Sequence, residues 1–236
     1  MRLHLPAFAA VALAVALGAG APADAAVRNF TVTGFDRIRI DGPFAVKLTT
    51  TVAPFARASG SPAALDAVSI EVQGRTLVVR ANSSAWKSDS RQAHGPVEIT
   101  VCTHELSMAW INGSGALSVD KVRGPSFEMS MQGSATAEIG GIAVDTLKLG
   151  LSGTASAVVG GKSAIVAAIV RGASALDGSA LTAKNATLGA EGAALIKLRA
   201  TDTAKISAQG PATVQIDGGA ACTIKAGGSA EVTGCR

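Results

Sequence analysis

Apolar and polar residues alternate along most of the chain, and the alternation is arranged around glycines at a nearly constant spacing. Residues four and two places before each glycine and four places after it are apolar, and the residue two places after it is small. The odd positions between them are mixed and include charged side chains. Because successive side chains of a strand point to opposite faces, this period of two predicts strands whose even positions face inward. The glycines lie 20, 20, 19, 20, 18 and 18 residues apart: Gly113, Gly133, Gly153, Gly172, Gly192, Gly210 and Gly228.

The phase of the alternation does not change across these glycines. A two-residue hairpin would reverse the chain there, whereas an unbroken phase predicts one strand that bends at a corner, where glycine tolerates unusual backbone angles. A helix is excluded, because apolar residues do not recur at helical spacing and a mid-helix glycine costs about 1 kcal/mol relative to alanine. The repeat therefore predicts an all-β, β-helix-like solenoid of about seven coils of 18–20 residues, covering residues 102–236.

The residues before this repeat are also predicted to be β-structure. The same alternation surrounds Gly42, but the bulky Phe44 stands where later copies have a small residue. Val68–Val72 and Leu77–Val79 flank a predicted tight hairpin, and 97–101 form a further strand. Because a solenoid needs an atypical end that closes the stack, residues 26–101 are interpreted as an N-terminal β cap.

The first residues have the features of a secretory signal peptide. Arg2 precedes an apolar run, Leu3–Gly20, that is short for a membrane-spanning helix and is followed by Ala23-Asp24-Ala25. Cleavage is predicted between Ala25 and Ala26, which assigns residues 1–25 to the signal peptide. The remaining chain is then exported to the periplasm, the cell surface or the medium, and does not span a membrane.

In an oxidising compartment, two of the three cysteines can form a disulfide. Spacing alone does not fix their connectivity. Cys222 and Cys235 both lie near the C-terminus, where a solenoid end frays most easily, so a disulfide between them is expected. Cys102 is then free and buried.

Composition argues against nucleic-acid binding. The net charge is +4, basic and acidic residues are interspersed, and aromatic residues make up only 3% of the chain. A nucleic-acid surface gathers lysine and arginine on one face and adds stacking aromatics. No nucleic-acid partner is expected, although the modest positive charge suits anionic envelope polymers.

The sequence contains no constellation typical of catalysis, so no catalytic, cofactor or metal residue is assigned. His94 and His104 do not recur in the repeat, and Ser114 follows a corner glycine in the manner of a turn residue. Glu128 and Glu138 are expected to project from different faces, whereas glycoside cleavage needs two converging carboxylates. A disulfide or a buried thiol is favoured over zinc at the C-terminal cysteines, because no histidine lies near them.

Three phrases carry a resemblance to a known family: FDRIRIDGPFAVKLTT, SIEVQGRTLVVRANS and the repeated G-S-G or G-S-A elements such as INGSGALSV. An exported chain with these phrases resembles the bacterial putative auto-transporter adhesin, head GIN domain family, over residues 30–235. The resemblance implies an all-β, β-helix-like domain that includes both the cap and the repeat. It transfers no catalytic or binding residue. Several copies depart from the pattern, as in Arg171-Gly-Ala and Glu191-Gly-Ala, which lack the serine.

Together these features favour an exported, non-enzymatic interaction module of the cell envelope or surface, adhesin-like in role. Its candidate partners are an envelope polysaccharide or a surface protein. The alternative is a periplasmic structural or stress-linked protein without an external ligand. A polysaccharide-active enzyme is a third and less favoured interpretation.

Overall fold

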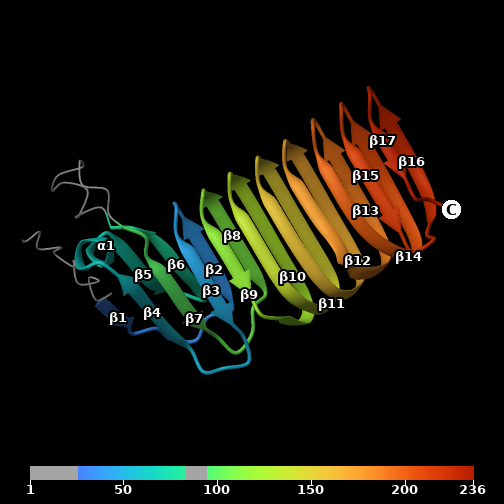
Figure 1. Ribbon diagram of the computed structural model, residues 1–236. Coiled ribbons are helices and arrows are strands. Elements are labelled where there is room, and N and C mark those ends of the chain that lie inside the picture. The colour runs from blue at the N-terminus through green and yellow to red at the C-terminus, as the bar shows by residue number, and fades with distance from the viewer. Residues whose placement is uncertain (1–25, 83–94) are drawn as a thin grey trace, which may run out of the picture.

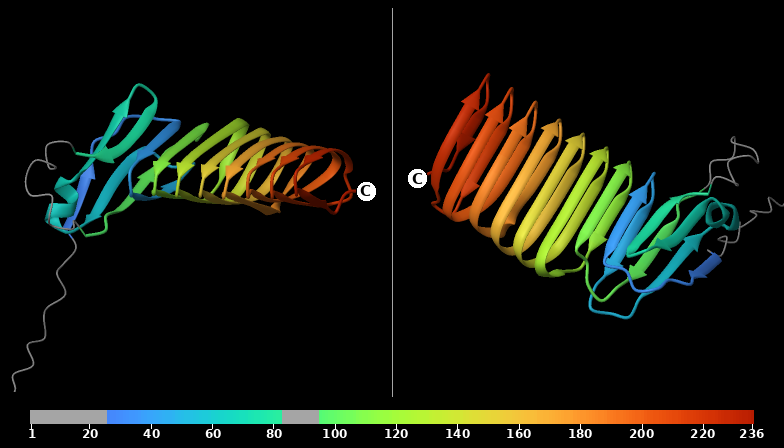
Figure 2. Two further views of the ribbon diagram at one scale, coloured as in Figure 1. Left: turned by 90° about the horizontal axis from the view of Figure 1, so that it is seen from above. Right: turned by 180° about the vertical axis from the view of Figure 1, so that it is seen from behind.

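A computed structural model describes residues 26–82 and 95–236 of the chain. The predicted signal peptide and His94 lie outside these residues. The fold is almost entirely β, with 71% of residues in strands and 3% in a helix, and forms a solenoid as predicted. The coils form a row with the N-terminal strands at one end and β16 (Ala221–Gly227) and β17 (Glu231–Thr233) at the other (Figures 1 and 2).

The N-terminal end combines antiparallel strands with one short helix. Antiparallel pairs join β1 to β4, β4 to β7 and β5 to β6, and the last pair is the predicted hairpin around Gly74. The helix begins at Pro62 because Ser61 caps it, its hydroxyl accepting a hydrogen bond from the amide of Ala64 at 3.2 Å. The elements are β1 (Ala26–Phe30), β4 (Phe55–Gly60), α1 (Pro62–Asp66), β5 (Val68–Gln73), β6 (Thr76–Ala81) and β7 (Glu98–Cys102).

The segment around Gly42 lies inside the stack, although the sequence assigned it to the cap. It comprises β2 (Arg37–Asp41) and β3 (Ala45–Thr49). These are parallel to β8 (Met108–Gly113) and β9 (Ala116–Val119) on one side and to β6 and β7 on the other. Figure 1 shows this segment in line with the later coils. The solenoid therefore extends by one coil into the N-terminal segment, and the antiparallel strands seal it.

The remaining strands form parallel coils, each with a sharp corner at its glycine and a wider bend near the middle of the coil. In each coil, the strand residues between a corner glycine and the wider bend form one surface, which we call face A. The strand residues between the wider bend and the next corner glycine form the other surface, face B. Register shifts at the wider bends, for instance between Ile139 and Ile142, accommodate the change of direction. The strands are β8 (Met108–Gly113), β9 (Ala116–Val119), β10 (Val122–Gly133), β11 (Thr136–Gly153), β12 (Ser156–Gly172), β13 (Ala175–Glu191), β14 (Leu195–Gln209), β15 (Thr213–Asp217), β16 (Ala221–Gly227) and β17 (Glu231–Thr233).

The solenoid makes about six turns, against the roughly seven coils expected. All seven corner glycines have positive φ angles, between +74° and +103°. At Gly153 a Cβ atom would lie 2.6 Å from the carbonyl oxygen of Gly133 in the preceding coil, so the close stacking of corners also excludes a side chain.

Inward side chains form a thin core between faces A and B. Phe127, Met129 and Leu149 are at most 3% exposed. The last coil is different, because no further coil covers it: Ile224 occupies an inward column, yet it is 44% exposed. The C-terminal end of the stack is therefore open.

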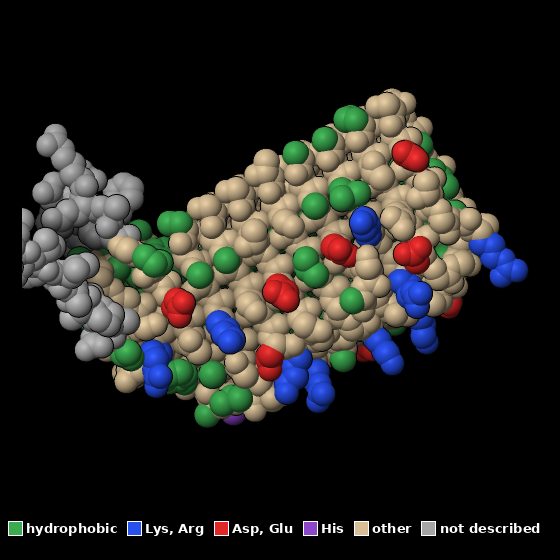
Figure 3. All heavy atoms as spheres, viewed as in Figure 1, with side chains coloured by type: hydrophobic (Ala, Val, Ile, Leu, Met, Phe, Trp, Pro, Cys, Tyr) green, Lys and Arg blue, Asp and Glu red, His purple; other side chains and the backbone are tan. Residues whose placement is uncertain are grey.

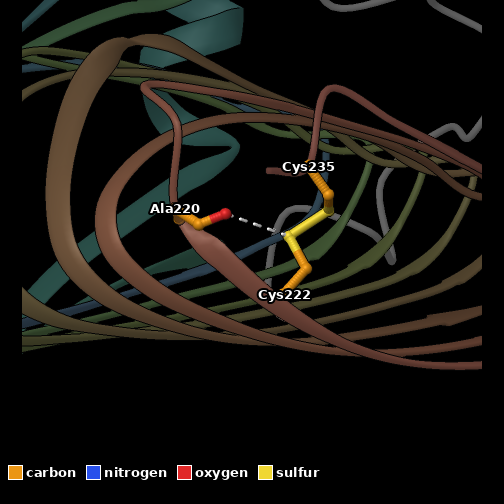
Figure 4. Close-up of a disulfide and its surroundings, with 3 residues drawn as sticks. All are labelled: Ala220, Cys222 and Cys235. Atoms are coloured by element: carbon orange, nitrogen blue, oxygen red, sulfur yellow. Dashed lines mark hydrogen bonds between the residues drawn. A yellow bond between two sulfur atoms is a disulfide. The ribbon is translucent and has the colours of Figure 1, made fainter.

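A disulfide joins Cys222 of β16 to Cys235, as predicted, with a Cα–Cα distance of 5.7 Å. Sγ of Cys222 lies 3.7 Å from the carbonyl oxygen of Ala220 (Figure 4). The bridge fastens the end of the chain to the open coil, where few packing contacts would otherwise hold it. Cys102 is free, but it is half-buried rather than buried as expected. Among the described residues, no helix has the length and apolar character needed to cross a membrane.

Candidate ligand-binding site

The residues singled out by sequence reasoning do not assemble into a catalytic site. The carbonyl of His104 accepts a hydrogen bond from the amide of Thr51 at 3.0 Å, which joins the loops that follow β3 and β7. Ser114 lies at the first corner of the repeat. Glu128 belongs to face B and Glu138 to face A. Within residues 26–82 and 95–236, no group of three histidine, cysteine or acidic side chains is arranged to hold a metal ion.

The one free thiol of the described chain is poorly suited to nucleophilic chemistry. Burial raises the pKa of the Cys102 thiol above its ordinary value, and the negative charge of Asp120 raises it further. A raised pKa leaves less thiolate at neutral pH, and thiolate is the reactive form. Cys102 is therefore best understood as a structural residue of β7.

A pocket of about 430 Å³ opens on the outer surface of face B, where the cap meets the first coils. We call it the Trp110 pocket. It crosses four neighbouring strands, which are β5, β6, β2 and β8 in spatial order. Its lining residues are Arg39, Gln73, Thr76, Val78, Trp110 and Asn112.

The repeat itself brings the central residues of this pocket together. Arg39 and Trp110 each lie three places before a corner glycine. Parallel strands in register place equal offsets side by side at the strand spacing of ~4.8 Å. Arg39 is consequently the cross-strand partner of Trp110, and in the same way Asp41 is the partner of Asn112.

A hydrogen-bonded network fixes the polar side of the pocket. The amide of Asn112 donates to Asp41 Oδ1 at 2.7 Å, and Nε of Arg39 donates to the same oxygen at 3.1 Å. Arg39 Nε also lies 2.8 Å from Asp41 Oδ2, in an ion pair. The Arg39 terminal nitrogens, the Gln73 amide and the Thr76 hydroxyl make no hydrogen bond to another described residue, so they are available to a ligand. The pocket thus presents polar groups that hydrogen bonds hold in place, and the charges of Arg39 and Asp41 compensate each other.

Sequence reasoning missed Trp110, although its position carried a signal. The alternation places it at an outward offset, in a column that continues with Ser130, Gly150 and Ile169. Trp110 is half-buried, and it lines the pocket beside Arg39 and Val78. Among the aromatic side chains of the described residues, Phe35 and Phe127 are buried in the core, whereas Phe30, Phe44 and Phe55 are half-buried like Trp110. Trp110 is the one aromatic among the described residues that line this pocket.

Two other hollows have less specific linings. One of about 600 Å³ crosses face A and is lined mainly by small side chains, together with Lys47, Glu98 and Glu138. The other, of about 300 Å³, lies at the wider bends beside Lys162 and Lys184. Basic side chains project along the edge of the stack in Figure 3, with acidic ones among them. Neither hollow contains an aromatic residue.

Solved structures of low sequence identity share this fold. A crystal structure of a putative adhesin from Bacteroides fragilis NCTC 9343 superposes with a TM-score of 0.79 at 14% identity, covering 90% of this chain and 98% of that one. A putative adhesin from Parabacteroides merdae ATCC 43184 gives 0.65 at 14% identity, with 89% and 97% covered. A putative lipid binding protein from Parabacteroides distasonis ATCC 8503 gives 0.67 at 18% identity, again covering 89% and 97%. At these identities the likeness concerns the fold alone.

No curated protein matches the chain significantly. The family model of the putative auto-transporter adhesin, head GIN domain, matches residues 34–220. The match includes β2, β3 and most of the solenoid, in agreement with the resemblance carried by the FDRIRIDGPFAVKLTT and INGSGALSV phrases. The chain therefore belongs to the putative auto-transporter adhesin, head GIN domain family.

Proposed function

We propose that this chain is an exported, non-enzymatic binding module that acts in the cell envelope or at the cell surface. The observation that carries the proposal is the Trp110 pocket. It combines an aromatic side chain with a polar network that is already hydrogen-bonded before any ligand arrives, as small-ligand sites do. Preorganised groups of this kind lower the entropic cost of binding.

The scaffold supports a binding role in the same way. Every strand of the solenoid is held by parallel neighbours on both sides until the last coil, so outward side chains stand at fixed spacings on a stiff surface. Membership of an adhesin family and the predicted signal peptide support a location outside the cytoplasm.

The proposal is tested by sedimentation with isolated envelope fractions. The purified chain beginning at Ala26 is mixed with peptidoglycan sacculi, outer-membrane vesicles or capsular polysaccharide from its native bacterium, and serum albumin provides the background. Saturable co-sedimentation with at least one fraction is expected. Recovery at the albumin level with every fraction would overturn the proposal. Protease treatment of intact cells then decides between surface and periplasm, because only a surface protein is digested before the envelope is opened.

A further inference from the structure

The most informative feature of the molecule beyond its fold is the chemistry of the Trp110 pocket. Its walls are amphipathic: the indole of Trp110 and the side chain of Val78 are apolar, whereas Arg39, Gln73, Thr76 and Asn112 provide hydrogen-bonding groups. A pyranose ring has the matching character, with C–H groups on one face and hydroxyls around its rim. An aromatic face attracts such C–H groups because it carries partial negative charge.

We infer that the Trp110 pocket binds a neutral pyranose carbohydrate. In this arrangement the indole contacts the C–H face of one sugar ring. The Arg39 terminal nitrogens donate to sugar hydroxyls or ring oxygens, and the Asn112 and Gln73 side chains exchange hydrogen bonds with further hydroxyls. The inference rests on the proposed binding function and specifies its ligand class.

The charge of the pocket favours a neutral sugar over an acidic ligand. Arg39 is the only charged residue that lines it, and its charge is compensated by Asp41 at 2.8 Å. A phosphate or carboxylate site would present uncompensated arginine or lysine instead. The polar lining also argues against a lipid chain, because burial of an acyl chain against these groups would remove them from water without a hydrogen-bonding partner.

The surroundings of Trp110 favour an oligosaccharide bound along its length. On the side of Trp110 away from Arg39, its cross-strand partner is Ser130, and the next residue in that row is Gly150. Neither has a side chain large enough to close the pocket toward the later coils. A sugar chain whose one ring lies on Trp110 can therefore continue along face B, and longer oligomers should bind more tightly than a monosaccharide.

The inference is tested by isothermal titration calorimetry of the chain beginning at Ala26. The probes are cellotetraose, chitotetraose, maltotetraose and β-1,4-galactotetraose, each compared with its monosaccharide. Saturable binding of at least one tetrasaccharide is expected, tighter than that of its monosaccharide. Trp110→Ala should weaken that binding about tenfold or more, a loss of about 1.4 kcal/mol. Trp110→Phe should weaken it less, because it keeps an aromatic face.

A control is available on the opposite surface of the stack. Leu195 of β14 follows the corner at Gly192, so it lies on face A, and it is 37% exposed. Leu195→Ala should leave the affinity unchanged, and thermal unfolding of each variant verifies that the stack is intact. Asn112→Ala, which removes a donor to Asp41, gives a second, non-aromatic test and should weaken binding several-fold.

Three results would overturn the inference. These are failure of all four tetrasaccharides to bind, equal affinity of wild type and Trp110→Ala, or Trp110-dependent binding to vesicles of phosphatidylethanolamine and phosphatidylglycerol, which would mark a lipid site. If the protein still sediments with an envelope fraction, the carbohydrate inference fails and the proposed function stands. If no fraction is bound, the proposed function itself fails.

Discussion

Substitution of a corner glycine tests directly why the repeat exists. In Gly153→Ala the new Cβ would lie 2.6 Å from the carbonyl oxygen of Gly133, on a backbone whose φ is +92°. A left-handed backbone costs an L-residue about 1–2 kcal/mol. The same carbonyl accepts the Thr154 amide at 2.8 Å, and displacing it weakens a hydrogen bond worth about 0.5–1.5 kcal/mol. Gly153→Ala should therefore lower the free energy of unfolding by about 2–3 kcal/mol or more.

Substitutions of two further glycines separate the cost of backbone strain from the cost of contact between stacked corners. Gly210 has φ +82°, but its added Cβ would lie no closer than 3.4 Å to its neighbours, so Gly210→Ala should show the backbone strain alone, about 1–2 kcal/mol. Gly150 lies in strand β11 without a positive φ, and its Cβ would meet nothing closer than 3.9 Å. Gly150→Ala should be neutral or stabilise the protein by up to about 1 kcal/mol, because alanine loses less backbone entropy.

The assay is equilibrium unfolding in guanidinium chloride, followed by the β-sheet signal in circular dichroism. The expected order of stability is Gly150→Ala, wild type, Gly210→Ala and Gly153→Ala. The corner argument is refuted if Gly153→Ala is as stable as wild type. It is also refuted if Gly210→Ala is the less stable of the two corner variants, because contact between stacked corners would then not limit the residue.

Three other predictions follow from the cysteines and from Asp177. Removing the disulfide with the double substitution Cys222→Ala and Cys235→Ala should destabilise the protein by about 2–3 kcal/mol, because the bridge closes a loop with a sequence separation of 13; thermal unfolding measures this, and Cys102→Ser is the control with an intact bridge. Because burial and Asp120 raise the pKa of Cys102, its alkylation by iodoacetamide at about pH 8 should be slower than that of free cysteine and should keep accelerating at higher pH. The hydroxyl and amide of Ser179 lower the pKa of Asp177, so its contribution to stability is present above the ordinary carboxyl pKa and is lost as the pH falls through the folded value. Asp177→Ala should accordingly destabilise the protein by less than about 1 kcal/mol at neutral pH, since the group is exposed, and by nothing measurable at about pH 2.

Each of these three predictions has a result that contradicts it. For the disulfide, that result is an unchanged melting temperature in the double variant. For Cys102, it is alkylation as fast as that of free cysteine. For Asp177, it is a destabilisation that persists unchanged in acid.

The fold was largely predictable because the alternation of apolar and polar residues within each coil indicates which side chains face inward and which face outward. A residue such as Met129 is buried as its column indicates. The prediction weakens where burial depends on a neighbouring coil: Ile224 has the inward position of its column, but no later coil covers it. The coil around Gly42 shows a second limit of prediction from sequence. Its alternation is visible in the sequence, but its position beside β8 is not, because the two strands are about seventy residues apart in the chain.

The candidate site was hidden for the same reason. Asp41 and Asn112 are 71 residues apart in sequence and meet only because β2 and β8 stack in register. Alternation marks Trp110 as outward, but it does not show that Arg39 and Thr76 form walls around it. The short helix at Pro62 was also not anticipated, since its start depends on a single serine cap.

The measurement that tests the central claim most directly is displacement of the protein from its own envelope by a soluble sugar. The chain beginning at Ala26 is bound to the envelope fraction that retains it, and the tetrasaccharide with the highest affinity is then added in increasing concentration. We predict release of the protein, half-complete at a sugar concentration above the dissociation constant measured by calorimetry, because the sugar competes with the envelope for the pocket. Retention of the protein at saturating sugar would contradict the account, because envelope binding would then not pass through the Trp110 pocket.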